Sequence, residues 1–250
     1  GTDLDRGMDE LVDEIESGSP SAYELLRHLY SRRIDDLGQR SRAILGIASV
    51  ASGPVPEDIL LAAVEAELAS AVLPSEGSKK AIEKGRDELI EGRLLREVDD
   101  DGVVAYTVSQ HPCRTAMKDQ LSDRDYARLC GRLADALGML SRERTSLRFE
   151  YELRAGRISK AMESAPEAAE EAERRFAFHR AAKLWRWVLE HEANLPEYSM
   201  LRPASELARV EDLAGRHAEA ARLYEVWAEQ AESRRERAEI RLRQAGAWLQ

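Results

Sequence analysis

The hydrophobic positions change their spacing within residues 81–121. They first recur every three or four positions, which indicates an amphipathic helix over Lys79–Glu91. Apolar residues then lead into the turn Asp99–Gly102, and residues 103–108 alternate between two faces. This part of the chain therefore predicts a helix, a β-hairpin and a further helix over 113–121.

Helical periodicity also dominates the residues before the hairpin. The spacing predicts helices over 21–37, 40–51 and 56–73, the last beginning at Pro56 after a rigid turn at 53–56. Because an isolated hairpin is marginal in water, this one is expected to pack on those helices. Helices followed by a two-stranded wing are the arrangement of a winged-helix domain.

The second half of the chain indicates amphipathic helices that pair through small residues, the first of them over 122–140. Residues 181–185 and 220–224 share the order Ala-Ala-basic-Leu-aromatic at a spacing of 39 residues. Small residues let neighbouring helices approach closely, as in tetratricopeptide-repeat (TPR) solenoids. Because this spacing differs from the TPR repeat of about 34 residues, and Leu-Pro-Glu-Tyr interrupts the pattern at 195–198, we expect irregular helical hairpins.

The expected fold is mainly α: a winged-helix domain with one small β-hairpin, followed by an irregular TPR-like α-helical array. The expected divisions are an acidic segment over 1–20, the winged-helix domain over 21–122 and the array over 123–250. The chain begins at Gly1 without an initiator Met and ends within a helical pattern. We therefore expect a piece of a longer protein, truncated at its C-terminus.

The chain is acidic, with a net charge of −10, and its first 20 residues contribute −6. The remaining charge is spread thinly, which argues against a broad phosphate-binding surface. Cys113 and Cys130 lack the spacing of a disulfide framework or a zinc site. No apolar run approaches the length of a membrane-spanning helix. A reducing, cytoplasmic location without membrane attachment is expected.

The common catalytic and phosphate-binding motifs are missing from the sequence, namely G-x-x-x-x-G-K-[ST], G-x-S-x-G, H-E-x-x-H and the kinase catalytic loop. The five histidines are scattered, without a pair at metal-ligand spacing. We therefore expect no catalytic residue, metal site or cofactor in this chain. The carboxylates within 163–173 are expected to form a solvated helix face. The large aromatic residues of the second half are expected to pack between helices: Trp185, Trp187, Tyr224, Trp227 and Trp248.

The helix over Lys79–Glu91 takes the position that DNA-reading winged helices insert into the major groove. Its basic residues are interleaved with acids, in the order Lys79, Lys80, Glu83, Lys84, Arg86, Asp87, Glu88, Glu91. Because those carboxylates repel phosphate, duplex DNA is not the expected partner. Between the wing and the next helix, His111 precedes backbone N–H groups that are suited to an anion.

Three stretches together resemble the region that follows the ATPase core in bacterial STAND proteins, the signal-transducing ATPases with numerous domains. They are LLR, RIDDL, AIL and ASVASGPV within 25–55, LIEGRLL at 89–95 with the wing after it, and AGR at 155–157 followed by AFHRAAKLW at 177–185. The order and spacing of these stretches are more specific than any one of them. The resemblance is greatest to members in which a serine/threonine kinase domain precedes the ATPase, and to regulators similar to the maltose activator.

That family carries a histidine after the wing, in the pattern YHDxxRExV, which reaches the bound nucleotide. Aligning Arg114 with the arginine of this pattern puts Gln110 at the histidine position and His111 at the aspartate. A shift by one residue restores His111 but misplaces Arg114. The resemblance thus implies Gln110, His111 and Arg114 as nucleotide contacts in the parent protein, where Gln110 can donate a hydrogen bond but cannot carry a positive charge.

The leading expectation is a non-catalytic regulatory and protein-interaction fragment of a multidomain STAND-like signalling ATPase. The resemblance implies that the winged helix packs on the nucleotide domain, while the helical array senses a protein partner or signal. The alternative is a winged-helix DNA-binding transcriptional regulator. A third hypothesis is a regulatory piece of an enzyme or kinase that holds ADP through Gln110, His111 and Arg114. Oligomerisation is left open by the sequence.

Overall fold

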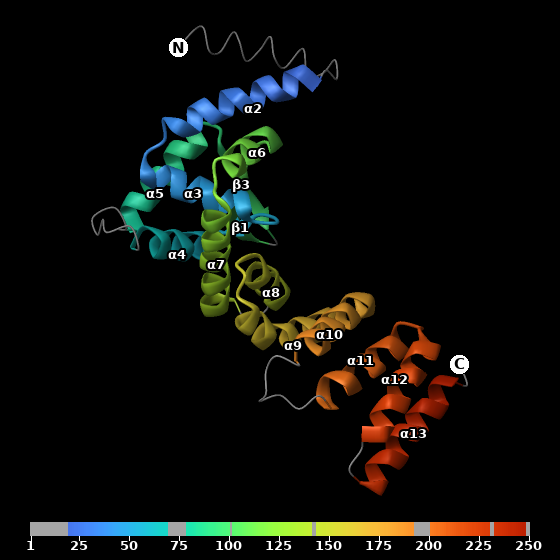
Figure 1. The fold of residues 1–250 in the computed structure, drawn as a ribbon. Coiled ribbons are helices and arrows are strands. Elements are labelled where there is room, and N and C mark those ends of the chain that lie inside the picture. Colours follow the sequence, from blue (N-terminus) through green and yellow to red (C-terminus); the bar gives the residue numbers. More distant parts are fainter. Residues whose placement is uncertain are drawn as a thin grey trace. The chain divides into compact units, whose positions relative to one another are not determined.

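The structure is a computed structural model of the 250-residue chain, and it describes residues 20–69, 79–100, 102–141, 144–192, 201–230 and 233–248. Residues 1–19 of the expected acidic segment, residues 70–73 of the third expected helix and the interruption at 195–198 lie outside the described residues. The described part contains twelve helices and a small three-stranded antiparallel sheet, so the expectation of a mainly helical fold is confirmed (Figure 1). Its contacts divide the chain into two compact units, Gly1–Leu140 (unit 1) and Ser141–Gln250 (unit 2).

Unit 1 is organised around one central helix. Its elements are α2 (Pro20–Asp35), α3 (Gln39–Val50), β1 (Val55–Pro56), α4 (Glu57–Ala69), α5 (Lys79–Glu91), β2 (Leu95–Asp100), β3 (Val103–Val108), α6 (His111–Asp119) and α7 (Asp123–Leu140). Every residue of α3 from Ile44 to Val50 is buried, and the helix contacts α4, α5, α6, α7 and β3. Burial on several sides at once makes α3 the core of the unit.

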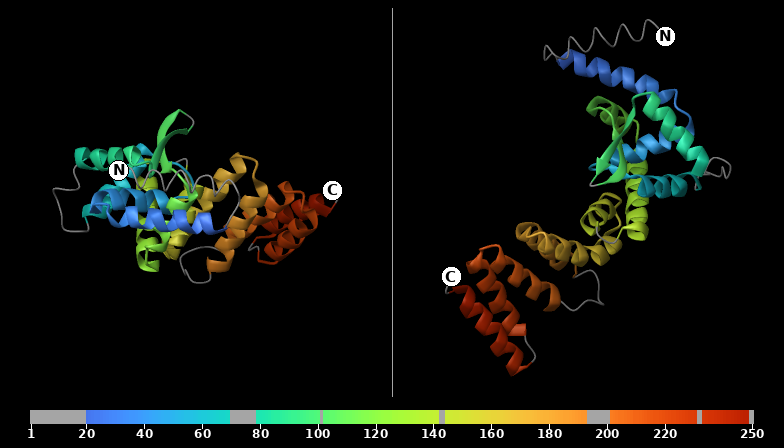
Figure 2. Two further views of the ribbon diagram at one scale, coloured as in Figure 1. Left: turned by 90° about the horizontal axis from the view of Figure 1, so that it is seen from above. Right: turned by 180° about the vertical axis from the view of Figure 1, so that it is seen from behind.

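The sheet of unit 1 has a third strand that the sequence did not predict. β2 and β3 form the expected antiparallel hairpin, which projects from the helices in the view from above (Figure 2). β1 pairs antiparallel with β3 on its other side, with Val55 opposite Tyr106. The expected rigid turn at 53–56 is therefore wrong for Val55 and Pro56, which form β1, and α4 begins at Glu57 instead of Pro56. A proline is tolerated in β1 because the strand lies at the edge of the sheet.

Helix α7 belongs to unit 1, whereas the sequence places the expected boundary at residues 122/123. The helix packs on α4 and α3, and its leucines Leu129, Leu133 and Leu137 are buried. A Cβ atom on Gly46 of α3 would lie 3.1 Å from a methyl carbon of Leu129, so the two helices approach closely at this glycine. The contacts divide the chain after Leu140, at the end of α7.

Unit 2 is a row of helices in which each packs mainly against the one before it and the one after it (Figure 1). Its elements are α8 (Thr145–Arg154), α9 (Ile158–Arg174), α10 (Phe178–Glu192), α11 (Leu201–Leu213), α12 (His217–Gln230) and α13 (Arg234–Trp248). The core of unit 2 is therefore built mainly from interfaces between consecutive helices.

Three turns of unit 2 repeat one backbone geometry. Gly156, Phe176 and Gly215 have φ values of 69°, 58° and 75°. After each of them, the next N–H donates to a carbonyl five residues earlier: Arg157 to Glu152, Ala177 to Ala172 and Arg216 to Glu211. This pattern is the Schellman helix end, which satisfies carbonyls that the helix leaves free. Five residues after each positive-φ residue stands a fully buried alanine: Ala161, Ala181 and Ala220. The turns and the following helices therefore form one recurring element.

Buried carboxylates connect the helices of unit 2. Glu171 accepts hydrogen bonds from the Thr145 hydroxyl and the Ser146 N–H, both at 2.8 Å, and pairs with Arg175 at 3.1 Å. Burial alone would raise the pKa of Glu171, but these hydrogen bonds together with Arg175 lower it. The prediction that the carboxylates within 163–173 form a solvated face is thus wrong for Glu171, since a solvated face was inferred from charge alone.

The aromatic residues of unit 2 follow the prediction only in part. Trp185 and Tyr224 are almost fully buried between helices, and Trp187 meets Phe149 edge to face with ring centroids 4.9 Å apart. Trp248 instead leaves 59% of its surface exposed at the end of α13, the last described helix. Inter-helix packing is therefore wrong as the explanation for Trp248.

Candidate functional site

The structure brings the residues implied as nucleotide contacts together at the start of α6, where α2 lies against them. The Tyr30 hydroxyl donates to Oε1 of Gln110 at 2.9 Å, and the Tyr23 hydroxyl lies 3.1 Å from Nδ1 of His111. Burial, with a smaller contribution from Cys113, raises the pKa of Tyr30 against the opposing effect of Arg33, so the phenol stays a proton donor. Both polar side chains at the start of α6 thus have partners on α2.

Arg114 directs its guanidinium into the protein. Its two Nη atoms donate to the backbone oxygens of Ser49 at 3.2 Å and Ala51 at 2.5 Å, and to the hydroxyl of Thr107 at 3.0 Å. The two carbonyls lie at the C-terminal end of α3, where the helix dipole favours a cation. In this structure Arg114 therefore joins α6 to α3 and β3.

The tyrosines that contact this group were not identified as site residues from the sequence. Tyr23 and Tyr30 lie 88 and 80 positions before His111 and Gln110. The helical stripe in the sequence shows that both tyrosines share one face of α2, but it does not show which helix covers that face. A signal for the pairing is absent from local sequence, because the contact depends on the tertiary packing of α2 against α6.

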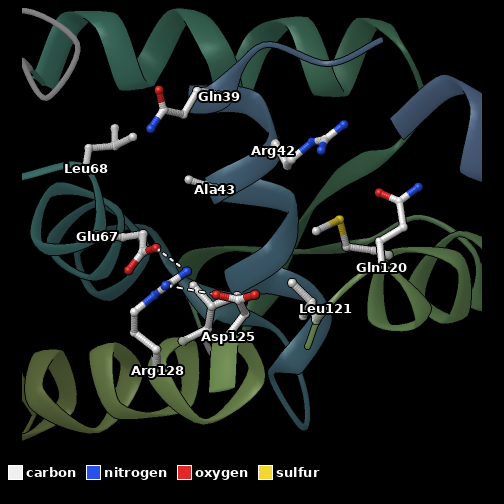
Figure 3. A pocket seen from close by; sticks show the side chains of 11 residues that line it. Gln39, Arg42, Ala43, Glu67, Leu68, Gln120, Leu121, Asp125 and Arg128 are labelled. Carbon is white, nitrogen blue, oxygen red and sulfur yellow. Dashed lines mark ion pairs between the residues drawn. The ribbon is translucent and has the colours of Figure 1, made fainter. Parts of the chain in front are cut away.

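A pocket of about 290 Å³ lies in unit 1 between α3, α4, α6 and α7 (Figure 3). Its apolar lining residues are Ala43, Leu68, Met117, Leu121 and Leu129. Its polar lining residues come from α3, α4, α7 and the residue that follows α6: Gln39, Arg42, Glu67, Asp125, Arg128 and Gln120. The volume is at the small end of the range for ligand sites. The mixed lining suits a small polar molecule or an inserted polar side chain.

The charges at this pocket mostly neutralise one another. Arg128 bridges Glu67 at 3.0 Å and Asp125 at 2.9 Å, as the dashed lines in Figure 3 show. The Ser122 hydroxyl, followed by Arg128, lowers the pKa of Asp125 and keeps it ionised near neutral pH. On the opposite side, Arg42 donates to the Ile34 carbonyl at 2.8 Å. These pairs hold α7 on α4 and α3 on the end of α2.

Helix α5 and the wing carry paired charges and acids. Arg86 ion-pairs with Glu57 and Asp87 and lies over the ring of Tyr106, with its Cζ atom 5.3 Å from the centroid. Burial raises the pKa of Tyr106 to about 12, against the opposing effect of Arg86. Lys84 lies 3.9 Å from Glu88. The most buried cation of α5 is thus directed toward the protein.

The wing adds acidic and apolar surface beside α5. Its strand β2 carries Glu97, Asp99 and Asp100, and Val103 and Val104 at the start of β3 are both more than two-fifths exposed. The carboxylates of β2 would repel the phosphates of DNA.

Among the described residues no group of three metal-ligating side chains is close enough to hold an ion. None of the helices within the described ranges has the length and apolarity needed to cross a membrane. The chain matches no family model, no curated protein and no solved structure.

Proposed function

We propose that this chain is a non-catalytic regulatory and protein-interaction part of a larger signalling protein of the STAND type, located in the cytoplasm. Unit 1 serves as a winged helix that packs on a nucleotide-binding domain. Unit 2 serves as a TPR-like array that receives a partner or signal. Binding to the array then biases a rearrangement between an inactive and an active state of the parent protein.

The winged-helix assignment is supported by the order of elements in unit 1. Helices α3, α4 and α5 precede the hairpin β2–β3, and β1, which lies between α3 and α4, completes the sheet in the order β1-β3-β2. α5 leads directly into the hairpin, so it holds the position of a recognition helix. The acids on α5 and the apolar, acidic wing favour a protein surface as its partner.

The observation that carries the proposal is the packing of α8–α13, which is mainly between consecutive helices, together with the recurring turn. A row of helices built this way exposes long continuous faces, and solenoids bind other proteins along such faces. Contacts of Gln110, His111 and Arg114 with a nucleotide in the parent protein remain part of the proposal. These contacts require that Gln110 and His111 first leave their present partners on α2, Tyr30 and Tyr23.

The test uses the polypeptide encoded directly upstream of Gly1 in the same reading frame, produced as a separate protein. We expect it to contain a phosphate-binding loop and to bind the purified 250-residue chain in calorimetry. The double substitution Val103→Ser and Val104→Ser is expected to weaken binding about tenfold, because it removes exposed apolar contacts. Arg124→Ser, an exposed change on α7, is the matched control. An upstream sequence without such a loop contradicts the STAND-type assignment.

The DNA-binding alternative is tested by a mobility shift with duplex DNA. Our proposal predicts only weak retardation that disappears as salt rises, because few phosphates are neutralised. Sequence-specific binding that survives at about 0.2 M salt would overturn the proposal. Tight binding of ADP with magnesium by the isolated chain would instead favour an ADP-holding regulatory piece, since the chain has no phosphate loop.

A further inference from the structure

The turn between α9 and α10 combines a backbone conformation that disfavours side chains with an exposed aromatic ring. Phe176 has a φ of 58°, whereas the equivalent positions of the other two recurring turns hold Gly156 and Gly215. A large side chain is disfavoured in this left-handed region. Phe176 nevertheless leaves 80% of its surface in solvent, so burial does not compensate for the unfavourable backbone conformation. A residue that is unfavourable in both respects indicates a role other than folding.

The ring of Phe176 lies beside a second phenylalanine. Phe178, the first residue of α10, is partly buried against the core of unit 2. The two rings meet edge to face, with their centroids 6.1 Å apart. Contact with a side chain that is anchored in the core restricts the orientations open to the exposed ring. The turn therefore presents a flat apolar surface to solvent in a limited set of orientations.

The same turn is strongly basic. Residues 174–183 contain four cations and no carboxylate, whereas the whole chain has a net charge of −10. One of the four, Arg175, forms an ion pair within α9. The other three form no ion pair within the described part of the chain, and they are exposed: Arg174, Arg180 and Lys183. Unpaired positive charge therefore stands on both sides of the exposed ring along the chain.

An exposed ring between unpaired cations is typical of a surface for single-stranded nucleic acid. Proteins that bind single strands hold the phosphates with cations and stack the bases on aromatic side chains. Because every base has a flat face, stacking on Phe176 requires no pocket in the partner. An acidic protein also offers negative charge, but it would need a pocket shaped for a ring that stands out from the surface. The observations therefore favour nucleic acid over protein at this turn.

We propose that the turn between α9 and α10 binds a short stretch of single-stranded nucleic acid without sequence preference. Phe176 stacks on a base, and Arg174, Arg180 and Lys183 contact the neighbouring phosphates. A duplex fits this site poorly, because its bases are already paired and stacked on one another. The inference concerns unit 2 alone, and it goes beyond the proposed function without depending on it.

The experiment measures the fluorescence anisotropy of a labelled oligouridine of about 12 nucleotides, titrated with the purified 250-residue chain. At about 0.05 M salt we expect saturable binding, about tenfold tighter than that of a duplex of the same length. Raising the salt tenfold should weaken binding about a hundredfold, because three neutralised phosphates give a logarithmic slope of about −2 for a single strand. No binding at low salt, or equal binding of the duplex, overturns the proposal.

The variant that tests stacking is Phe176→Gly. It gives this turn the residue found at the equivalent positions, so the fold is expected to be kept and stabilised. Binding should nevertheless weaken about tenfold because a stacked base is lost, whereas Phe176→Trp should retain it. Leu213→Ala, which shortens an exposed apolar side chain near the turn at Gly215, is the control and should leave binding unchanged. Unchanged affinity of Phe176→Gly overturns the proposal.

Charge reversal separates a local site from general electrostatic attraction. Replacing the three unpaired cations of the turn with Glu should abolish binding. The same replacement at three exposed arginines of α13, which changes the net charge equally, should weaken binding only about twofold: Arg234, Arg235 and Arg241. Equal losses from the two reversals overturn the proposal.

A competition experiment tests the other class of partner. Poly-L-glutamate carries negative charge without bases, so at equal charge it should displace the oligouridine only weakly. Displacement as complete as that by unlabelled oligouridine would assign the turn to an acidic protein and overturn the proposal. None of these results bears on the binding of the upstream polypeptide.

Discussion

The two units of the chain are stabilised by contacts of different range. In unit 1, polar side chains join segments that lie far apart in the sequence, as Arg114 does with Ser49 and Ala51 and Gln120 does with Ser31. In unit 2, the buried carboxylates and the Schellman turns act mainly between consecutive helices. We infer that unit 1 unfolds as a whole, whereas unit 2 can open locally.

The substitution with the largest expected effect on this difference is Trp185→Ala in unit 2. Trp185 is 1% exposed, and truncation leaves a cavity between α9, α10 and α11, so we expect a loss of about 3–5 kcal/mol in the free energy of unfolding. Hydrogen exchange measured by mass spectrometry should show faster exchange in those helices, with unit 1 unchanged. Trp248→Ala is the matched control, because that side chain is mostly exposed. Faster exchange in unit 1 would contradict local opening.

The corresponding test in unit 1 is Arg114→Ala. The substitution leaves the buried carbonyls of Ser49 and Ala51 without their donor, which should cost about 2–3 kcal/mol. Exchange should accelerate throughout unit 1, including α7, since α3 contacts most of its elements. Arg124→Ala, at an exposed position, controls for the loss of charge. Acceleration confined to α6 would show that unit 1 also opens locally.

A smaller effect is expected from Glu171→Gln in unit 2. Replacing the carboxylate weakens two charge-assisted hydrogen bonds, and we expect a loss of about 1–2 kcal/mol at neutral pH. Because folding lowers the pKa of Glu171, its contribution is complete above the unfolded pKa and is lost as the pH falls through the folded pKa. Thermal melts followed by circular dichroism at about pH 7 and pH 3 should therefore differ less for the variant. Glu167→Gln, on the exposed side of α9, should behave like the unaltered chain.

The smallest expected effects come from the recurring turn. Gly156→Ala introduces a side chain at a positive φ and should cost about 1 kcal/mol, whereas Phe176→Gly removes one and should gain about 0.5–1 kcal/mol. Urea titrations of both variants measure the two shifts. A stabilised Gly156→Ala variant would show that this turn is not held in the left-handed region.

The comparison between the units also explains what the sequence could predict. The hairpin β2–β3 and the helix over Lys79–Glu91 follow from local periodicity, and the structure confirms both. β1 is only two residues long, so it carries no period and depends on pairing with β3. The partners of α7 show the same limit, because its apolar stripe predicts a helix without identifying α4 and α3 as the helices it packs against.

The candidate site was the least predictable part. The resemblance drew attention to Gln110, His111 and Arg114, and the structure places them together at the start of α6. Their partners Tyr30, Tyr23 and the end of α3 come from positions about 60–90 residues earlier, as the contacts of α6 show. The burial of Glu171 was missed because its partners, Thr145 and Ser146, lie on the preceding helix.

The packing of α8–α13, mainly between consecutive helices, has a mechanical consequence. Under tension applied to the ends of unit 2, each helix can detach after losing mainly the interfaces with its two neighbours. The array should therefore lengthen at low force in several small steps, one helix at a time, and shorten again when the force is removed. A chain built this way can transmit a pull gradually along its length.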